Sequence, residues 1–343
     1  MNTTPVLDVK NLHVDFATFG GTVHAVRGVS YQVNAGKTLA VVGESGSGKS
    51  VTVQTIMGLI PAPPGKIIAG SAKLNGQELI GLDTSALNKL RGPEMAMIFQ
   101  DPMTSLNPTM KVGWQIAESL CNHKGIAKEV ALKEAIRLLD KTHIPEAKKR
   151  ANQYPFEFSG GMLQRVMIAM SLACKPSLLI ADEPTTALDV TIQNQVLELM
   201  NEIQKDDGMA IILITHDLGV VAKMANEVAV MYAGQIVESG SVDDIFYQTA
   251  HPYTAGLKKS MPSIDHAHRD PLIAIEGSHP DLFDPPKGCG FAARCQHAMN
   301  ICGKQIPPEF SISQQHQAQC WLHHHQIADL QQNNTEITIK AAV

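Results

Sequence analysis

A glycine-rich loop at residues 43–50 constrains the fold of this chain more than any other stretch. Its sequence is Gly-Glu-Ser-Gly-Ser-Gly-Lys-Ser, and it follows the apolar run 39–42. The next segment has apolar residues at helical spacing as far as Ile60, before Pro61, and so predicts a helix. A strand, a glycine loop and a helix in this order are typical of a phosphate-binding loop, whose backbone N–H groups and helix N-terminus face an anion. The sequence therefore predicts a nucleoside triphosphate site.

Two side chains at the end of the loop have specific expected roles. Lys49 is expected to reach the β- and γ-phosphates, and the hydroxyl of Ser50 to ligate Mg²⁺. The other predicted nucleotide-binding residues of the loop are Gly43, Ser45, Gly46, Ser47 and Gly48. An ordinary glycine turn is the competing interpretation, but the Lys-Ser pair after a strand favours the phosphate site.

Length, composition and charge exclude several classes of protein. The chain has 343 residues, of which 44% are hydrophobic, so it can form one large domain with an extension. A net charge of −5 without a basic patch or tail argues against a nucleic-acid partner. No apolar run is long enough to span a membrane, and the first residues do not resemble a signal peptide. We therefore expect a cytoplasmic protein whose membrane contact comes through partners.

Two further apolar runs end in polar residues that suit phosphate chemistry. Residues 178–181 form a predicted buried strand, followed by Asp182 and Glu183. Ligands bind at the carboxyl ends of such strands, so Asp182 is expected to hold Mg²⁺ and Glu183 to polarise the attacking water. The second strand, 211–215, ends at His216, which we expect to contact the γ-phosphate. The competing interpretations are a solvated acidic pair and a polar strand terminus.

Helical patterns dominate residues 112–175. Within them, Ser159-Gly160-Gly161 precedes an apolar face at helical spacing. Ser159 is a good N-cap, and a helix start of this kind can bind an anion. Taken alone, the triplet favours an ordinary helix cap.

Together these motifs resemble those of the ATP-binding subunits of ABC transporters, over essentially the whole chain. The matching stretches are the Walker A loop at 43–50, the Q-loop glutamine Gln100, the signature at 158–162, Walker B at 178–182 followed by Glu183, the D-loop at 187–189 and the switch histidine His216. Their number, order and spacing make the resemblance specific.

The resemblance implies a RecA-like α/β core with a small antiparallel β region and a helical subdomain at about residues 103–175. We expect an ATP-binding domain over 1–258 and a small irregular C-terminal domain over 259–343. ATP would be sandwiched in a head-to-tail dimer, with Ser159, Gly160 and Gly161 capping the partner's γ-phosphate. Gln100 would assist Mg²⁺ binding. Phe16 falls where the family places an aromatic that stacks on adenine, although inward packing of this strand residue is an equal alternative.

The chain departs from the usual family motifs at two places. Phe158 and Met162 replace the ends of the usual Leu-Ser-Gly-Gly-Gln signature, and Met162 cannot hydrogen-bond a ribose as an amide would. Val51 stands where a Ser or Thr is common, which leaves its backbone N–H for the α-phosphate. Neither departure removes a catalytic group from this chain's Walker motifs.

Other stretches resemble the oligopeptide/dipeptide/nickel importers within this family. They are 98–108 and 251–254, and residues 87–91 and 145–151 look closest to an oligopeptide-permease subunit that pairs with a second, different ATPase. The resemblance implies two permease chains, an external peptide-binding protein and a peripheral position on the cytoplasmic face of a bacterial inner membrane. Dipeptides, nickel, glutathione and antimicrobial peptides remain alternative substrates. A soluble ABC ATPase without a transporter is the alternative from another class.

The segment beyond about residue 258 is rich in Pro, His, Gln and Cys. It carries four of the six cysteines, Cys289, Cys295, Cys302 and Cys320, separated by five, six and seventeen residues. Four thiolates suit a zinc ion or a [4Fe–4S] cluster. The gaps exceed the spacing of about two to four residues common in zinc sites, which favours the cluster, and peptide importers with a similar pattern carry one. Free structural thiols are the competing interpretation, as expected for Cys121 and Cys174.

Overall fold

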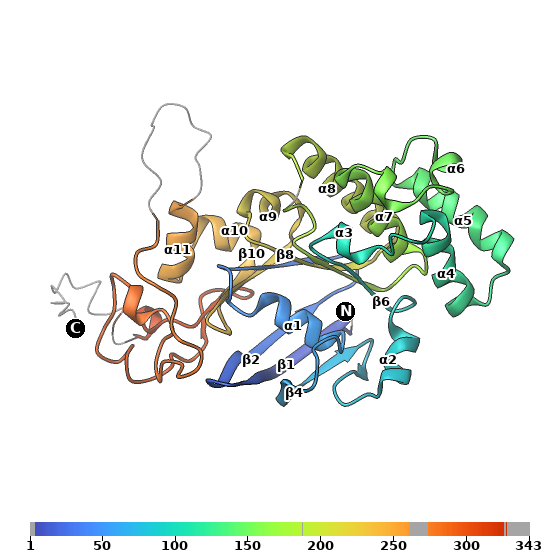
Figure 1. Ribbon diagram of the computed structural model, residues 1–343. Helices are drawn as coiled ribbons and strands as arrows, with labels where there is room; N and C mark the ends of the chain where they lie inside the picture. Colours follow the sequence, from blue (N-terminus) through green and yellow to red (C-terminus); the bar gives the residue numbers. More distant parts are fainter. Residues whose placement is uncertain (1–3, 187, 261–273, 326, 328–343) are drawn as a thin grey trace, which may run out of the picture.

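The computed structural model describes residues 4–186, 188–260, 274–325 and 327. A mixed sheet crosses the molecule, with most of the helices on one face and a smaller antiparallel sheet on the other (Figure 1). Helix α1 (Lys49–Ile56) lies between the two sheets, where its Val53 and Ile56 join the same apolar cluster as residues of both. This is the α/β architecture with antiparallel and helical parts that the sequence predicts.

The central sheet has eight strands in the order β11-β12-β10-β9-β3-β8-β7-β6. Strands β9, β3, β8, β7 and β6 run parallel, and β10, β12 and β11 add antiparallel pairs. The bounds are β3 Thr38–Val42, β6 Met95–Ile98, β7 Leu178–Asp182, β8 Ala210–Thr215, β9 Glu227–Tyr232, β10 Gln235–Ser241, β11 Phe310–Ser311 and β12 Gln317–Ala318. Strands β3, β7 and β8 are buried along their whole length, which confirms the prediction from the continuous apolar runs.

The antiparallel sheet has the order β2-β1-β4-β5. Its strands are β1 Leu7–Thr18, β2 Gly21–Val33, β4 Gly65–Leu74 and β5 Gln77–Glu78. The turn between β4 and β5 contains Asn75 and Gly76, with φ of 48° and 83°, as the Asn-Gly pair predicts.

Most of the helices connect one strand of the central sheet to the next along the sequence. Besides α1, the described helices are α2 Thr84–Leu90, α3 Pro102–Ser105, α4 Val112–Lys124, α5 Lys128–Lys141, α6 Ala147–Arg150, α7 Gly160–Leu172, α8 Val190–Asp207, α9 Leu218–Met224, α10 Val242–Tyr247 and α11 Pro252–Lys259. Short 3₁₀ helices span Pro155–Glu157, Ala292–Arg294 and Trp321–His323. Helix α1 is shorter than expected, because Gly58 adopts a left-handed φ of 64° after the helix ends.

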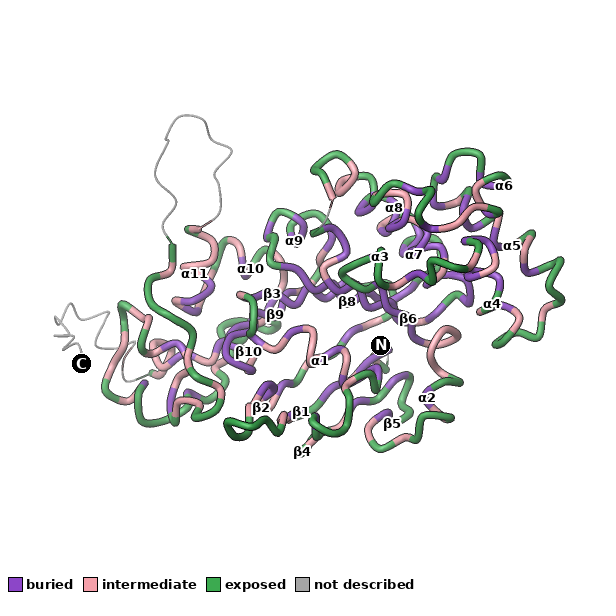
Figure 2. The backbone as a smooth tube through the Cα atoms, viewed as in Figure 1, coloured by how far each residue is buried: buried purple, intermediate pink, exposed green. Residues whose placement is uncertain are grey.

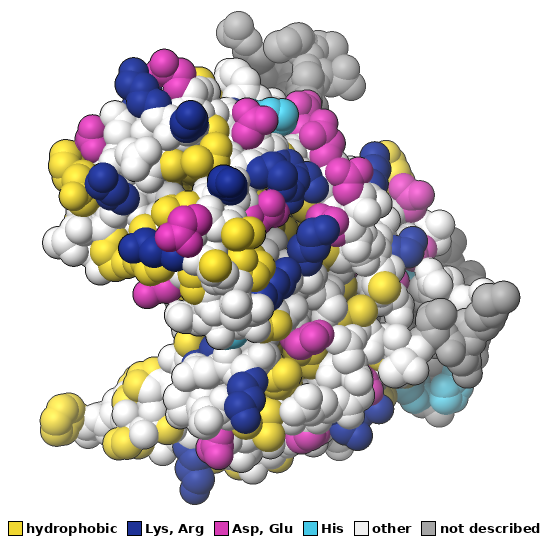
Figure 3. Space-filling view, turned by 90° about the vertical axis from the view of Figure 1, so that its right-hand side faces the viewer, with side chains coloured by type: hydrophobic (Ala, Val, Ile, Leu, Met, Phe, Trp, Pro, Cys, Tyr) yellow, Lys and Arg dark blue, Asp and Glu magenta, His cyan; other side chains and the backbone are white. Residues whose placement is uncertain are grey.

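Figure 2 shows the central strands as the most continuously buried part of the chain. One apolar cluster packs the helical layer against the sheet, with Ile116, Leu139 and Leu163 fully buried in it. A second cluster fills the space between the two sheets and includes Leu7, Leu12 and Ile56. The face in Figure 3 carries interspersed basic and acidic side chains, without a continuous basic band. Among the described residues no helix is long and apolar enough to cross a membrane.

The described part of the C-terminal region packs directly on the edge of the central sheet. Strand β12 pairs with β10, and Phe291 lies in one buried cluster with Tyr232 and Tyr253. The side chains of Glu238 and His316 are fully buried and lie 2.8 Å apart. Residues on both sides of the predicted boundary at 258 therefore share one core. The boundary itself stays a prediction, and residues 261–273 and 328–343 lie outside the described residues.

Candidate functional site

The phosphate-binding loop connects β3 to α1, and its conformation requires glycine at two positions. Gly43 has φ of 154°, and a Cβ atom there would lie 2.1 Å from the carbonyl oxygen of Met231. At Gly48 φ is 100°, and a Cβ atom would lie 2.5 Å from the carbonyl oxygen of Ala25. The loop is thus pressed against neighbouring backbone, which only glycine permits.

Lys49 is buried at the base of this loop. Its Nζ donates to the carbonyl oxygens of Gly43 and Glu44, at 2.8 and 3.0 Å. Burial lowers the pKa of Lys49, while the nearby carboxylates of Glu183 and Asp182 oppose that shift. A buried ammonium group aimed into the loop can exchange these carbonyl contacts for phosphate oxygens.

Ser50 and Asp182 lie side by side, although 132 positions separate them in the sequence. The hydroxyl of Ser50 donates to Oδ1 of Asp182 at 2.9 Å. Burial and the neighbouring Glu183 raise the pKa of Asp182, whereas the hydrogen bond from Ser50 and the charge of Lys49 lower it. A hydroxyl and a carboxylate oxygen in contact are a fitting donor pair for Mg²⁺, which binds oxygen ligands.

Glu183 is the centre of a polar cluster at the end of β7. Its carboxylate accepts hydrogen bonds from Gln100 Nε2 at 2.9 Å and from the Thr186 hydroxyl at 3.0 Å. Nδ1 of His216 lies 3.4 Å from the other carboxylate oxygen. Glu183 also has a positive φ of 48°, which is uncommon for a residue other than glycine and often marks functional sites. The cluster can orient a water molecule.

These groups surround one pocket of about 700 Å³. Its predicted lining residues are Ser45, Gly46, Gly48, Lys49, Ser50, Val51, Gln100, Glu183 and His216. Four further residues line the pocket. Glu44 belongs to the predicted phosphate-binding loop, although no role was predicted for its side chain. Val23 and Ala25 on β2 and Leu282 in the C-terminal region have no signal in the sequence that connects them to the nucleotide. The volume suits a small-molecule ligand.

Phe16 does not line this pocket. It lies partly buried on β1 against the core between the two sheets. Its ring is so close to Gly65 that a Cβ atom there would lie 3.1 Å from its Cε1. Phe16 thus packs inward, which was one of the two alternatives that the sequence left open. Stacking of Phe16 on adenine stays a prediction.

The signature residues also lie apart from the pocket lining. The side chain of Ser159 accepts the backbone N–H of Met162 at 3.4 Å and so caps α7. Ser159 and Gly160 are exposed, and Phe158 is buried beneath them. In the predicted D-loop, Asp189 caps α8, while residue 187 lies outside the described residues. The start of the signature helix is thus exposed at the surface and does not line this chain's own pocket.

The four C-terminal cysteines line one small cavity. Its other lining residues include Phe291 and Trp321. All four are free thiols, and burial raises the pKa of Cys289 to about 11 and that of Cys320 to about 12. The backbone N–H of His297 points at Sγ of Cys295, and that of Met299 at Sγ of Cys302, both at 3.4 Å. In the described part of the chain no group of three or more His, Cys, Asp or Glu side chains is arranged to hold a metal ion. The sequence prediction of a metal site therefore lacks support from ligand geometry.

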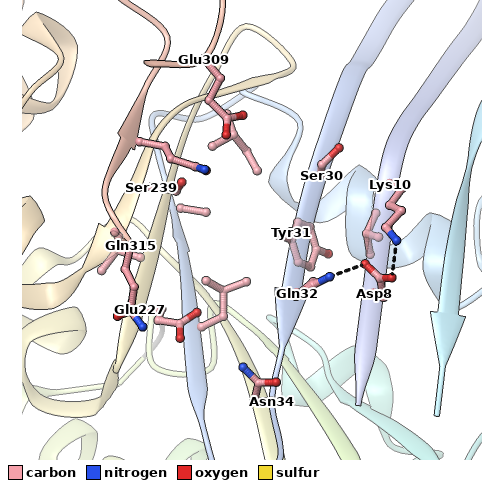
Figure 4. Close-up of a pocket in the computed structure, with 17 residues that line it drawn as sticks. Asp8, Lys10, Ser30, Tyr31, Gln32, Asn34, Glu227, Ser239, Glu309 and Gln315 are labelled. Atoms are coloured by element: carbon pink, nitrogen blue, oxygen red, sulfur yellow. Dashed lines mark hydrogen bonds and ion pairs between the residues drawn. The ribbon is translucent and has the colours of Figure 1, made fainter. Parts of the chain in front are cut away.

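A separate cavity of about 430 Å³ lies between the antiparallel sheet and the C-terminal strands (Figure 4). It is lined by Tyr31, Glu227 and Glu309 among others, and Asp8 pairs there with Lys10 at 2.9 Å. None of the predicted phosphate, magnesium or catalytic residues reaches it.

Comparisons with known proteins agree with this geometry. A family described as "ABC transporter" matches residues 26–186, and one described as "Oligopeptide/dipeptide transporter, C-terminal region" matches residues 237–302. The chain is 57% identical to the oligopeptide transport ATP-binding protein OppD of Bacillus subtilis, over 94% of this chain and 90% of that protein. It is 53% identical to the dipeptide transport ATP-binding protein DppD of the same organism, over 92% of this chain and 94% of that protein.

Solved structures show the same fold. A dimeric ATP-binding cassette, MJ0796, bound to ADP and Pi in a post-hydrolysis state, is 25% identical with a TM-score of 0.62. The similarity covers 69% of this chain and 98% of that one. CbiO1 from Clostridium perfringens, part of an ABC transporter complex, is 27% identical with a TM-score of 0.61, over 72% of this chain and 93% of that one.

Proposed function

The chain belongs to the ATP-binding subunits of ABC transporters, and from this premise we propose that it is the ATPase that powers an oligopeptide importer. The observation that carries the proposal is the convergence of Lys49, Glu183 and His216, from separate strand ends, around one pocket. The similarity to oligopeptide and dipeptide transport proteins along nearly the whole chain supports a peptide substrate. Dipeptides, nickel, glutathione and antimicrobial peptides are the alternatives within this family.

The proposed reaction is hydrolysis of the bond between the β- and γ-phosphates of ATP. The carboxylate of Glu183, held by Gln100 and Thr186, accepts a proton from water as the water oxygen attacks the γ-phosphorus. The bridging oxygen leaves with ADP. Lys49 and His216 stabilise negative charge on the transferred group. Ser50, Asp182 and Gln100 would hold Mg²⁺, which would supply positive charge to offset that of the phosphates.

Membership of this family implies a dimer of ATP-binding chains. The exposed start of α7 at Ser159 and Gly160 supports a head-to-tail arrangement, in which this helix caps the γ-phosphate in the partner's pocket. We propose a second, different ATPase as the partner. Met162 cannot donate to a ribose, so the signature that this chain presents is expected to bind more weakly than one with glutamine.

Membrane permeases are implied as partners in the same way. Phe99 and Met103 lie on either side of Gln100 in the sequence, and their apolar side chains are 41% and 63% exposed. We propose that this region passes the motion of the ATPase to a permease helix. The full complex would contain two permeases and an external peptide-binding protein, with this chain peripheral on the cytoplasmic face of a bacterial inner membrane.

We propose that Cys289, Cys295, Cys302 and Cys320 hold a [4Fe–4S] cluster, with zinc as the alternative. The shared cavity and the backbone N–H groups directed at two of the sulfur atoms support a set of thiolate ligands. The cluster would stabilise a segment with little regular structure.

The test is purification from native membranes, followed by metal, sulfide and uptake measurements. We expect co-purification with two permeases and a second ATPase, with about four iron and four sulfide per chain. Zinc in place of iron would keep the transporter and replace the cluster. Isolation of a lone ATPase without membrane partners, or unchanged peptide uptake in cells that lack the chain, would contradict the importer proposal.

A further inference from the structure

Part of the C-terminal region returns to the nucleotide pocket. Leu282 lines the pocket beside Val23 and Ala25. The carbonyl oxygen of Leu282 accepts the backbone N–H of His24 on β2, at 2.9 Å. The ring of Phe283 lies against the β1–β2 turn, where a Cβ atom on Gly21 would be 3.5 Å from it. This segment is therefore anchored at the rim of the pocket, more than 200 positions away from the loop in the sequence.

Arg294 links the same region to the phosphate-binding loop itself. Its Nη1 and Nη2 atoms donate to the two carboxylate oxygens of Glu44, at 2.8 and 3.2 Å. The side chain of Arg294 is only 5% exposed and that of Glu44 25%. Because the pair is bidentate and largely shielded from water, its geometry is better defined and it is screened less by salt than a surface ion pair.

Additional contacts fix both members of the pair. Arg294 donates to the backbone carbonyls of Ile275 and Glu276, each at 3.0 Å, and to the hydroxyl of Tyr232 at 3.2 Å. The backbone N–H of Glu44 donates to the hydroxyl of Tyr253 at 2.9 Å. The C-terminal region thus determines where the second residue of the loop lies.

The charge of Glu44 makes this contact important for ligand binding. Glu44 lines the pocket, and its backbone carbonyl accepts a hydrogen bond from Lys49. An unpaired carboxylate at this place would repel a triphosphate, and it would compete with the phosphates for the ammonium group of Lys49. Arg294 pairs with both oxygens of that carboxylate and so offsets its negative charge at the pocket wall.

We propose that residues 275–294 form a wall of the nucleotide site, in which Arg294 positions and neutralises Glu44 for phosphate binding and Leu282 contacts the nucleoside part of ATP. This inference rests on the proposed function only in that ATP is the ligand. Arg294 is a positioning residue, because it acts through Glu44. Leu282 is a specificity-determining residue, since an apolar side chain can favour a nucleoside but not inorganic phosphate.

The first experiment measures binding of Mg²⁺-ATP and of Mg²⁺-tripolyphosphate, which lacks a nucleoside, to the full-length chain. We expect Arg294→Ala to weaken both ligands by about tenfold or more, because the partly exposed carboxylate of Glu44 loses its bidentate partner and keeps only the weaker contact with His279, whose Nε2 lies 3.3 Å away. Adding Glu44→Gln to Arg294→Ala should restore both affinities to within about threefold of the wild type. Arg294→Lys keeps the positive charge but cannot form the bidentate contact, so its affinities should lie between those of the wild type and Arg294→Ala.

Arg137→Ala is the matched control, since Arg137 pairs with Glu134 on the distant helix α5. Melting temperatures of all variants identify those that fail to fold. A merely structural role for Arg294 predicts no recovery on adding Glu44→Gln, and that result would overturn the positioning role. Unchanged affinity in folded Arg294→Ala would do the same.

The second experiment uses Leu282→Ala, with Leu132→Ala on α5 as the matched control for a partly buried leucine. We expect about threefold to tenfold weaker binding of ATP and unchanged binding of tripolyphosphate. Equal loss for both ligands, or no loss, would overturn the nucleoside contact. A wild-type chain that binds neither ligand would instead contradict the proposed function, so the two failures are distinguishable.

Discussion

The nucleotide pocket and the cysteine cavity are both built from residues far apart in the sequence, but different structural elements hold those residues in place. At the pocket, Asp182 ends β7, Glu183 follows it and His216 follows β8, and the carboxyl ends of these buried parallel strands meet at one edge of the sheet. In the cavity, Cys289, Cys295, Cys302 and Cys320 lie in or beside loops and short 3₁₀ helices. A sheet edge imposes geometry before any ligand binds, whereas a loop-rich cavity needs either its neighbours or a ligand to do so.

The contrast teaches where each site can be perturbed. Residues at strand ends can be replaced with loss of chemistry and little loss of structure, because the strands are packed independently. Cysteines in a segment whose only strands are the two-residue β11 and β12 are expected to be coupled to its folding. The following variants test this difference, in order of decreasing expected effect.

Replacing the proposed general base should affect chemistry alone. We expect Glu183→Gln to slow ATP hydrolysis by about 10²–10⁴-fold, the usual contribution of general base catalysis, with ATP binding retained. Steady-state turnover and nucleotide binding of the assembled transporter measure the two effects. Glu202→Gln, an exposed change on α8, is the control. Unchanged turnover in Glu183→Gln would exclude Glu183 as the base.

Replacing a proposed cluster ligand should affect both metal and structure. We expect Cys302→Ser to abolish bound iron and sulfide and to lower the melting temperature, because the loop-rich segment loses its cross-link. Iron and sulfide analysis with thermal unfolding checks this outcome. Cys121→Ser, on α4 in the helical layer, should change neither quantity. Full metal retention in Cys302→Ser would rule out that ligand.

Gly48 in the phosphate-binding loop and Gly36 outside it both have a positive φ, but only Gly48 is close to other backbone atoms. Comparing them separates the effect of a steric clash from the effect of a strained backbone conformation. Gly48→Ala should lower the free energy of unfolding by about 3 kcal/mol, because it places a methyl group against the backbone of Ala25 and requires a positive φ. Gly36→Ala also requires a positive φ but meets no atom within 4 Å, so it should cost about 1 kcal/mol. Chemical denaturation measures both values. Equal losses would show that the contact with Ala25 is relieved by movement of the loop.

The smallest effect is expected at Phe16. Phe16→Leu keeps an apolar side chain next to Gly65 but removes the aromatic ring, so we expect ATP affinity to change by no more than about twofold. Titration with ATP and with tripolyphosphate checks this expectation. A large loss for ATP alone would instead support stacking of Phe16 on adenine.

Much of the nucleotide site could be predicted because its signals are local. The Lys-Ser pair after a glycine loop, the acidic pair after one apolar strand and the histidine after another each occupy a few adjacent residues. Parallel strands then bring these endpoints together by a general rule of α/β sheets. The Asn-Gly turn between β4 and β5 was predictable for the same reason, since Asn75 and Gly76 specify their own backbone conformation.

Other features had no local signal. Helix α1 ends at Ile56 although apolar spacing continues, because Gly58 takes a left-handed conformation and the later residues still pack on the core. Nothing near Leu282 or Arg294 in the sequence indicates proximity to the loop. Their contacts depend on how the C-terminal region packs on β9, β10 and α11.

The sequence by itself determined the phosphate-binding loop, the buried strands that end at its partner residues, and the set of cysteines, since each follows from residue type and spacing. The tertiary structure alone decided that Glu44 faces Arg294 and that Leu282 lines the pocket. Contacts between segments so far apart arise from the packing of whole layers. No short stretch of sequence encodes such packing, because it depends on surfaces that form only when the chain has folded.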